Sequence, residues 1–252
     1  MPCTPIFIHI VYSMISFKQY FQEAITLTSQ YHSELNPKLW DNDTLKSEVR
    51  MHLLKIASAW AEFSNIPKDT IRDILMVGGN ANFNYTPHSD IDLHILIDKN
   101  DYKKDPKMFD EYFKDKKELW SNIHNISIYG HDVELYAQAV GAPSPSDQGV
   151  YSILHDEWVK HPKHEQVRPE SNQIQTKVEE YANKIDSMIS SKASIEHFLK
   201  LKEKLKNMRI AGLKQSGEFS IENIVFKELR NLGYIDHIND HITSNQDKDL
   251  SL

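Results

Sequence analysis

One stretch of the sequence, Val77 to Asp98 (VGGNANFNYTPHSDIDLHILID), limits what this chain can fold into more than any other. The apolar run from Ile71 to Val77 that leads into it is typical of a β-strand and ends in two glycines. The segment from Asp90 to Asp98 begins with alternating acidic and apolar residues and then becomes almost wholly apolar. This second pattern predicts another strand, with one polar end and one buried end.

Asp90 and Asp92 stand at the polar end of the second strand. Because side chains alternate along a strand, both carboxylates point to the same face and lie close together. They repel each other unless a cation neutralises them, and Mg²⁺ is often held by one or two carboxylates together with substrate phosphates. The glycine pair before them has no side chains to keep a phosphate away from the backbone. The stretch therefore predicts a metal and phosphate site.

A third carboxylate is expected on a later strand, in the segment from 126 to 138. We favour Glu134, because its apolar neighbours Val133 and Leu135 place it inside a regular strand. Asp132 lies on the same face of the strand as Glu134 and is the alternative third carboxylate, although it is nearer the turn expected at Gly130. Three such carboxylates could hold two metal ions and polarise an oxygen that attacks a phosphoryl group in line.

The order of strand, Gly-Gly, loop, Asp-x-Asp and later acidic strand resembles the DNA polymerase β nucleotidyltransferase superfamily. The elements expected from residue 44 to 138 also follow the order of its minimal fold. The resemblance implies an α+β fold, with a mixed sheet flanked by helices and a C-terminal helical region. It implies two Mg²⁺ ions, for which Mn²⁺ can substitute, and transfer of a nucleoside monophosphate from an NTP with release of pyrophosphate.

The resemblance also assigns roles to residues. Asp90 and Asp92 bind both metals, and Glu134 binds the catalytic metal and helps to activate the acceptor. The residues expected to bind the nucleotide, by cradling the β- and γ-phosphates or by contacts nearby, are Gly78, Gly79, Asn80 and Ser89. Ser89 either orients Asp90, touches a phosphate or only caps the start of the strand.

One departure from the superfamily concerns Gly79, because many members have serine there and use its hydroxyl on phosphate. Backbone N–H groups could suffice, or Asn80 could assist. This departure supports an alternative function, a catalytically lapsed domain that binds nucleotide or RNA as a sensor or antagonist. The acceptor of an active enzyme stays open between an RNA 3′ end, a protein side chain, a second nucleotide and a small molecule.

A narrower likeness concerns the segments 89–93 (SDIDL) and 149–152 (GVYS). They are similar to uncharacterised nucleotidyltransferases carried by large tailed phages, which would place the protein in the host cytoplasm. Met14 is as plausible a start as Met1. The apolar run from 5 to 15 is too short to span a bilayer and has no signal-peptide pattern, so we expect a soluble cytoplasmic protein without membrane contact.

Hydrophobic periodicity predicts three regions, an N-terminal extension with a helix (1–40), the nucleotidyltransferase core (41–168) and a C-terminal helical domain (169–252). Helices are expected at 16–31, 44–63, 106–123, 172–190, 194–213 and 220–232, with a polar frayed tail from Ser244. The segment 126–138 predicts one long strand or a hairpin about Gly130.

The net charge of −7 argues against a broad nucleic-acid-binding surface, and the single cysteine excludes a disulfide framework. The acidic excess lies in residues 1–170, whereas 171–252 is neutral and contains a run of lysines. Within this run Lys200 and Lys204 could hold the triphosphate or an RNA acceptor, with Lys227 as a further candidate. The alternative is a solvated helix face.

Three aromatic residues near the carboxylates have two interpretations each. His94 lies on the same face of the predicted strand as Asp90 and Asp92, and it either contacts substrate or is a hydrogen-bonded interior residue. Phe83 and Tyr85, in the loop after the glycines, either stack on a base or pin the loop to the core.

Overall fold

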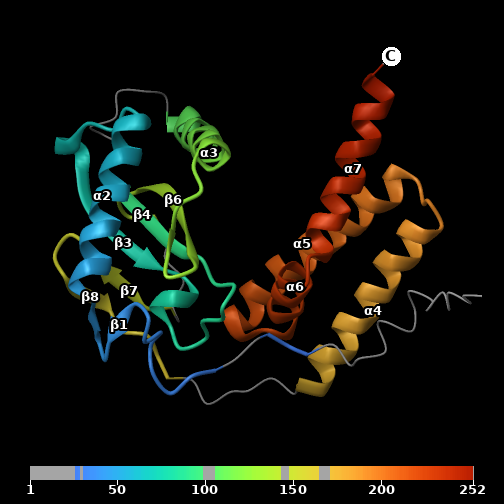
Figure 1. Ribbon diagram of the computed structural model, residues 1–252, viewed down its shortest axis with the longest axis horizontal. Helices are drawn as coiled ribbons and strands as arrows, with labels where there is room; N and C mark the ends of the chain where they lie inside the picture. Colours follow the sequence, from blue (N-terminus) through green and yellow to red (C-terminus); the bar gives the residue numbers. More distant parts are fainter. Residues whose placement is uncertain (1–25, 29–30, 99–105, 143–147, 165–170, 252) are drawn as a thin grey trace, which may run out of the picture.

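The computed structural model describes residues 26–28, 31–98, 106–142, 148–164 and 171–251 (Figure 1). Within them the chain is α+β, with one mixed six-stranded sheet in the order β5-β6-β4-β3-β7-β8 and a separate two-stranded ribbon, β1-β2. The strands are β1 (Trp40–Asp41), β2 (Thr44–Leu45), β3 (Ile71–Val77), β4 (Ile91–Ile97), β5 (Ser127–Ile128), β6 (His131–Ala139), β7 (Val150–Ser152) and β8 (Glu157–Lys160).

The register of the three central strands fixes the position of the acidic residues. β3 and β4 are antiparallel, with Val77 opposite Asp92. β4 and β6 are parallel, with Asp92 opposite Glu134. Burial alternates along β4, so Ile91 and Leu93 are fully buried while Asp92 and His94 point to the other face. The aspartates and Glu134 therefore lie on the same face and at the same end of the sheet.

Two helices cover the apolar face of the sheet, α2 (Ser47–Phe63) and α3 (Pro106–Ile123). They also contact each other, since Trp60 of α2 lies 6.1 Å from Phe113 of α3 between ring centroids. Both rings pack in one core with Leu93 of β4. This packing leaves the acidic face of the sheet to the C-terminal helices.

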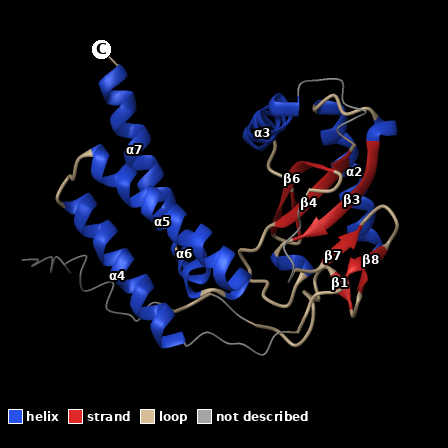
Figure 2. Ribbon diagram, turned by 180° about the vertical axis from the view of Figure 1, so that it is seen from behind, coloured by secondary structure: helices blue, strands red, loops and turns tan. Residues whose placement is uncertain are grey.

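The C-terminal region is a helical bundle with a core of its own (Figures 1 and 2). Its helices are α4 (Ser171–Ser190), α5 (Ile195–Ser216), α6 (Ile221–Asn231) and α7 (Tyr234–Leu250). Val178, Phe198, Leu205 and Leu229, one or two from each of the first three helices, are fully or almost fully buried together. Ser220 caps α6, because its hydroxyl accepts a bond from the backbone N–H of Asn223.

The structure overturns one expectation, decides between two alternatives and adds two strands. The tail from Ser244 is not frayed, because α7 continues to Leu250 after Ile238 and Ile242 anchor it in the helical core. The segment 126–138 is a hairpin, β5 and β6, that turns at Gly130 with φ +85°. Strands β7 and β8 were not predicted.

The predicted helix at 16–31 and both possible start residues lie mostly or wholly outside the described residues. Of that helix, only residues 26–28 and 31 are described, and they are not helical. Among the helices of the described residues, none is long and apolar enough to cross a membrane.

The segment before β1 connects the sheet to the bundle. Thr28 donates from its backbone N–H and its hydroxyl to the buried carboxylate of Glu228 on α6, at 2.8 and 3.0 Å. A few residues later, His32 donates from its backbone N–H to the carbonyl of Phe83 at 2.8 Å, and its ring stacks on Tyr85. Because this segment is bonded to both parts, it helps to hold them on opposite sides of one cavity.

Candidate active site

A cavity of about 1470 Å³ lies between the acidic face of the sheet and the C-terminal helices. A pocket that holds one drug-sized ligand is ~300–1,000 Å³, so this cavity has room for more than one such group. The sheet side of its wall includes Gly78, Gly79, Ser89, Asp90, Asp92 and Glu134, and the helical side includes Arg209, Lys227 and Arg230. The helical side also contains one carboxylate, Glu218, so its three cations leave it net basic opposite the acidic sheet side.

The carboxylates of the acidic wall are close enough to perturb each other. Burial, together with the charges of Glu134 and Asp90, raises the pKa of Asp92 to about 7. Burial and the charge of Glu134 also raise the pKa of Asp90. Such a cluster favours a bound cation, because a cation neutralises the repulsion between the carboxylates.

Gly78 touches Asp92 so closely that no other residue fits. Its φ and ψ are 77° and −165°, a region essentially restricted to glycine. A Cβ at this position would lie 1.9 Å from a carboxylate oxygen of Asp92. The predicted glycine turn therefore lies directly against the predicted metal site.

Gly79 faces the hydroxyl of Ser89. A Cβ at Gly79 would lie 3.0 Å from this oxygen, which also accepts a bond from the backbone N–H of Thr86 at 2.9 Å. Both Gly79 and Ser89 line the cavity. A hydroxyl thus lies beside the second glycine, although position 79 supplies none.

Asn80 does not fit its predicted role at the phosphates. It is fully buried, and its amide donates to the carbonyls of Ser89 and Asp90 at 3.0 and 2.9 Å. Its amide oxygen accepts a bond from Asn36 at 2.8 Å. His131, from β6, bonds the same Ser89 carbonyl at 2.7 Å. Asn80 therefore anchors the turn before Asp90, and its side chain does not reach the cavity.

Glu134 is the carboxylate that β6 brings to the site. Its oxygen Oε2 accepts a bond from Lys117 of α3 at 2.7 Å and another from the Tyr136 hydroxyl. Burial raises the pKa of Glu134, but these two bonds and the Lys117 charge outweigh burial and hold it below the ordinary value. Asp132, the alternative, is exposed and does not line the cavity.

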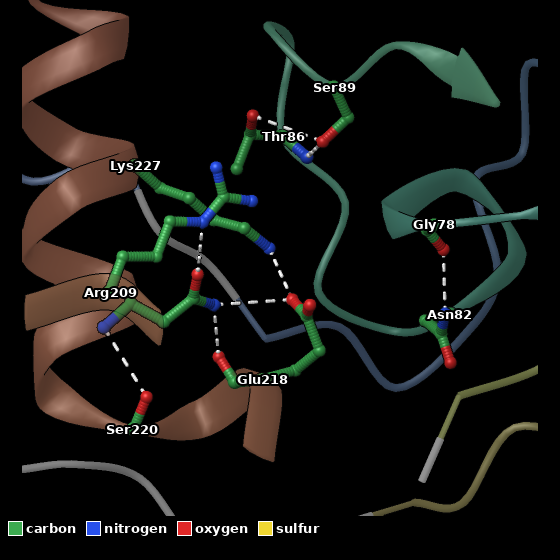
Figure 3. Close-up of polar contacts among 9 residues, drawn as sticks. Gly78, Asn82, Thr86, Ser89, Arg209, Glu218, Ser220 and Lys227 are labelled. Atoms are coloured by element: carbon green, nitrogen blue, oxygen red, sulfur yellow. Dashed lines mark hydrogen bonds and ion pairs between the residues drawn. The ribbon is translucent and has the colours of Figure 1, made fainter. Parts of the chain in front are cut away.

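The basic wall comes from α5 and α6. Arg209 lies on α5, while Lys227 and Arg230 lie on α6. Figure 3 shows Arg209 and Lys227 extending from the helices toward the loop that contains Thr86 and Ser89. The three cations thus face the loop and carboxylates across the cavity.

Neutral and acidic side chains fix two of these cations. Lys227 pairs with Glu218, a largely buried carboxylate in the turn before α6 (Figure 3). Arg209 donates to the amide oxygen of Asn223 at 3.2 Å, and Asn223 in turn donates to the backbone carbonyl of Glu218 at 2.7 Å. These bonds hold the cations in place before any anion binds.

Lys200 and Lys204, which the sequence proposed for binding the triphosphate or an RNA acceptor, do not line the cavity. Lys200 pairs with Glu196 at 2.7 Å on an exposed surface, and Lys204 lies 5.5 Å from the ring centroid of Tyr181. The reason is helical phase, because Lys200 precedes Arg209 on α5 by about two and a half turns and so points to the opposite side. Of the lysines proposed from the sequence, only Lys227 lies in the cavity wall.

The three aromatic residues considered in the sequence have different positions in the structure. His94 lines the cavity and bonds Gln138 at 2.6 Å, while burial lowers its pKa. Phe83 and Tyr85 do not line the cavity. Phe83 packs against the sheet core, as the second interpretation expected, while Tyr85 is stacked on His32 with ring centroids 3.8 Å apart.

Lys117 and Arg230 were not singled out from the sequence. Lys227 and Arg230 are three residues apart, a spacing that puts both on one side of a helix, and this was the available signal for Arg230. No local pattern indicates that Lys117 reaches Glu134, because the contact joins two different elements, α3 and β6, with the two residues 17 positions apart.

The acidic wall fits a hard cation shared with a substrate better than a complete protein cage. Among the described residues, no cluster of three or more His, Cys, Asp or Glu side chains is arranged so that it could hold a metal ion. Mg²⁺ usually keeps waters and is bound through one or two carboxylates and substrate phosphates, so Asp90 and Asp92 supply a suitable donor set.

No protein-family model matches the sequence, and no curated protein matches it. A chain of the E. coli MS115-1 CdnC:HORMA-deltaN complex is 14% identical with a TM-score of 0.23, over 75% of this chain and 61% of that chain, less than two thirds of its length. The STING-associated CdnE c-di-GMP synthase from Capnocytophaga granulosa is 12% identical with a TM-score of 0.21, over 81% and 84%. At these TM-scores neither likeness bears on function.

Proposed function

We propose that this chain has the polymerase β-like nucleotidyltransferase fold and is a Mg²⁺-dependent nucleotidyltransferase. It would move a nucleoside monophosphate from an NTP to a hydroxyl or phosphate acceptor and release pyrophosphate. The observation that carries this proposal is one cavity with Asp90, Asp92 and Glu134 on one wall and cationic side chains on the other. A triphosphate with its divalent cation needs both kinds of wall at once.

Each wall has a defined task in this proposal. Asp90 and Asp92 would hold the cation, which when bound neutralises phosphate charge as a Lewis acid. Gly78 lets the backbone lie against Asp92 without a side chain between them. Lys227 and Arg209 would bind oxygens of the β- and γ-phosphates, which leave as pyrophosphate when the α-phosphate is transferred. Because the acceptor leaves no signature in the described residues, RNA, protein, nucleotide and small-molecule acceptors are all to be tested.

The decisive experiment supplies each α-³²P-labelled NTP with Mg²⁺ or Mn²⁺ and total RNA, protein lysate or nucleotides as acceptor. The wild-type chain is expected to transfer label to one acceptor class and to release pyrophosphate. Asp90→Ala and Asp92→Ala are expected to lose at least about 100-fold in rate, since even indirect partners of metal ligands cost ~10–100-fold.

The matched control is Asp132→Ala, which removes an exposed carboxylate from the same strand as Glu134. It is expected to keep the wild-type rate. Transfer that persists in both aspartate variants would exclude the proposed site, and absence of transfer with every acceptor would exclude the activity.

The catalytically lapsed alternative depended on the missing serine at position 79. The Ser89 hydroxyl lies beside Gly79 and lines the same cavity, so the absence of a side chain at 79 does not favour loss of activity. Tight NTP binding without pyrophosphate release in the same assay would favour the sensor instead.

A further inference from the structure

We propose that Lys117 is a positioning residue that orients Glu134 for a divalent cation. This proposal rests on the proposed function, because it concerns the same carboxylates. Lys117 belongs to α3, which covers the opposite face of the sheet from the cavity, and it is not part of the cavity wall. The contact therefore has to pass around the sheet.

The path is open because β6 is only partly covered by another strand. On one side β6 pairs with β4 from Val133 to Ala139. On the other side, within the described residues, it pairs with β5 only at His131 and Asp132. The last backbone bond on this side runs from the N–H of Val133 to the carbonyl of Ile126 at 2.9 Å. Beyond it, no strand among the described residues pairs with this edge, so a long side chain can cross from one face to the other.

Helical phase directs Lys117 to this edge. It lies four residues after Phe113 and three before Trp120, two buried residues that pack α3 on the sheet. Its ammonium reaches Glu134 at 2.7 Å and lies 3.6 Å from the ring centroid of Tyr136. Lys117 is therefore held by a carboxylate and an aromatic face at once.

The bonds leave Glu134 half engaged. Lys117 and the Tyr136 hydroxyl both donate to Oε2, and no donor among the described residues bonds Oε1. Asp92 is the residue directly opposite in the parallel register. Ligating carboxylates are commonly held by hydrogen bonds from behind, so this arrangement leaves one fixed oxygen for a cation beside Asp92.

The test measures Mn²⁺ binding to the full chain without nucleotide, by electron paramagnetic resonance of free Mn²⁺. Lys117→Met is expected to weaken binding by about tenfold or more, and Lys117→Arg to recover most of it. Lys114→Met is the matched control, because it removes an exposed charge from the same helix. It is expected to bind Mn²⁺ as the wild type does.

Labelled transfer with the same variants gives a second readout. Lys117→Met is expected to lower kcat by about tenfold or more and to leave KM for ATP within about twofold, since Lys117 does not line the cavity. A folded Lys117→Met variant that binds Mn²⁺ as well as the wild type, or more tightly, would overturn the positioning role. Mn²⁺ binding that is unaffected by Asp92→Asn in the wild type would instead overturn the proposed function.

Discussion

Gly78 shows how a single backbone position fixes the chemistry of the site. Its combination of φ 77° and ψ −165° is essentially restricted to glycine, and its contact with Asp92 leaves no room for a Cβ. Asn80 acts nearby through the opposite means, since a fully buried amide holds the carbonyls of Ser89 and Asp90. Between them these two residues determine where the aspartates lie.

Gly78→Ala is expected to abolish transfer and to lower the free energy of unfolding by about 1–3 kcal/mol, because the new Cβ is strained and displaces Asp92. Urea denaturation and the labelled-transfer assay measure the two effects. Gly130→Ala is the control, since Gly130 has a similar φ but open space around it. It should lose about 1–2 kcal/mol and keep its activity. Equal activity in both variants would contradict the role of Gly78.

At the scale of elements, the start of α6 organises the basic wall. Glu218, in the turn before α6, pairs with Lys227, nine residues later on α6, and the side chain of Glu218 is only 17% exposed. Burial raises the pKa of Glu218, but Lys227, Arg209 and a bond from Asn223 outweigh burial and hold it below the ordinary value of 4.5. The ionised form is therefore stabilised in the folded bundle.

Because the folded pKa of Glu218 is depressed, its contribution to stability is fully present above pH 4.5 and is lost as the pH falls through the folded pKa. The wild type is expected to exceed Glu218→Gln by about 1.5–3 kcal/mol in unfolding free energy at neutral pH. Denaturation of both proteins between about pH 6 and pH 3 should show this difference shrinking. A difference that stays constant over this range would contradict the assignment.

At the scale of the whole molecule, two separate cores face one cavity. The sheet with α2 and α3 forms one core and the C-terminal helices form the other. Thr28 is bonded to α6 of the helical core, and His32 is bonded to Phe83, which packs against the sheet core. A ligand that contacts both walls therefore ties the two cores together.

ATP with Mg²⁺ is expected to raise the melting temperature of the whole chain, since a ligand at 100 times its Kd adds about 2.7 kcal/mol of stability. Lys227→Met should lose most of this increase, because a hydrogen bond to a charged group contributes about 1.5–3 kcal/mol. Lys200→Met should keep the increase, because Lys200 lies outside the cavity wall. Scanning calorimetry measures the shifts, and an equal loss in the two variants would contradict the basic wall.

The sequence by itself determined the local features of this protein. Alternation and periodicity predicted β3, β4, α3 and the whole of α2 with a start three residues too early, together with the helical C-terminal region. They could do so because each pattern lies within one element. The glycine turn and the pair Asp90 and Asp92 could be recognised for the same reason. Glu134 could be named as the third carboxylate, although Asp132 stayed open.

Only the tertiary structure decided which distant groups share the cavity. The parallel register of β4 and β6 put Glu134, rather than Asp132, beside Asp92. The direction in which α5 and α6 face decided that Lys227, and not Lys200, lines the wall. Packing around Asn80 turned an expected phosphate contact into a buried anchor. These outcomes depend on contacts between elements far apart in the chain, and no local residue pattern encodes such contacts.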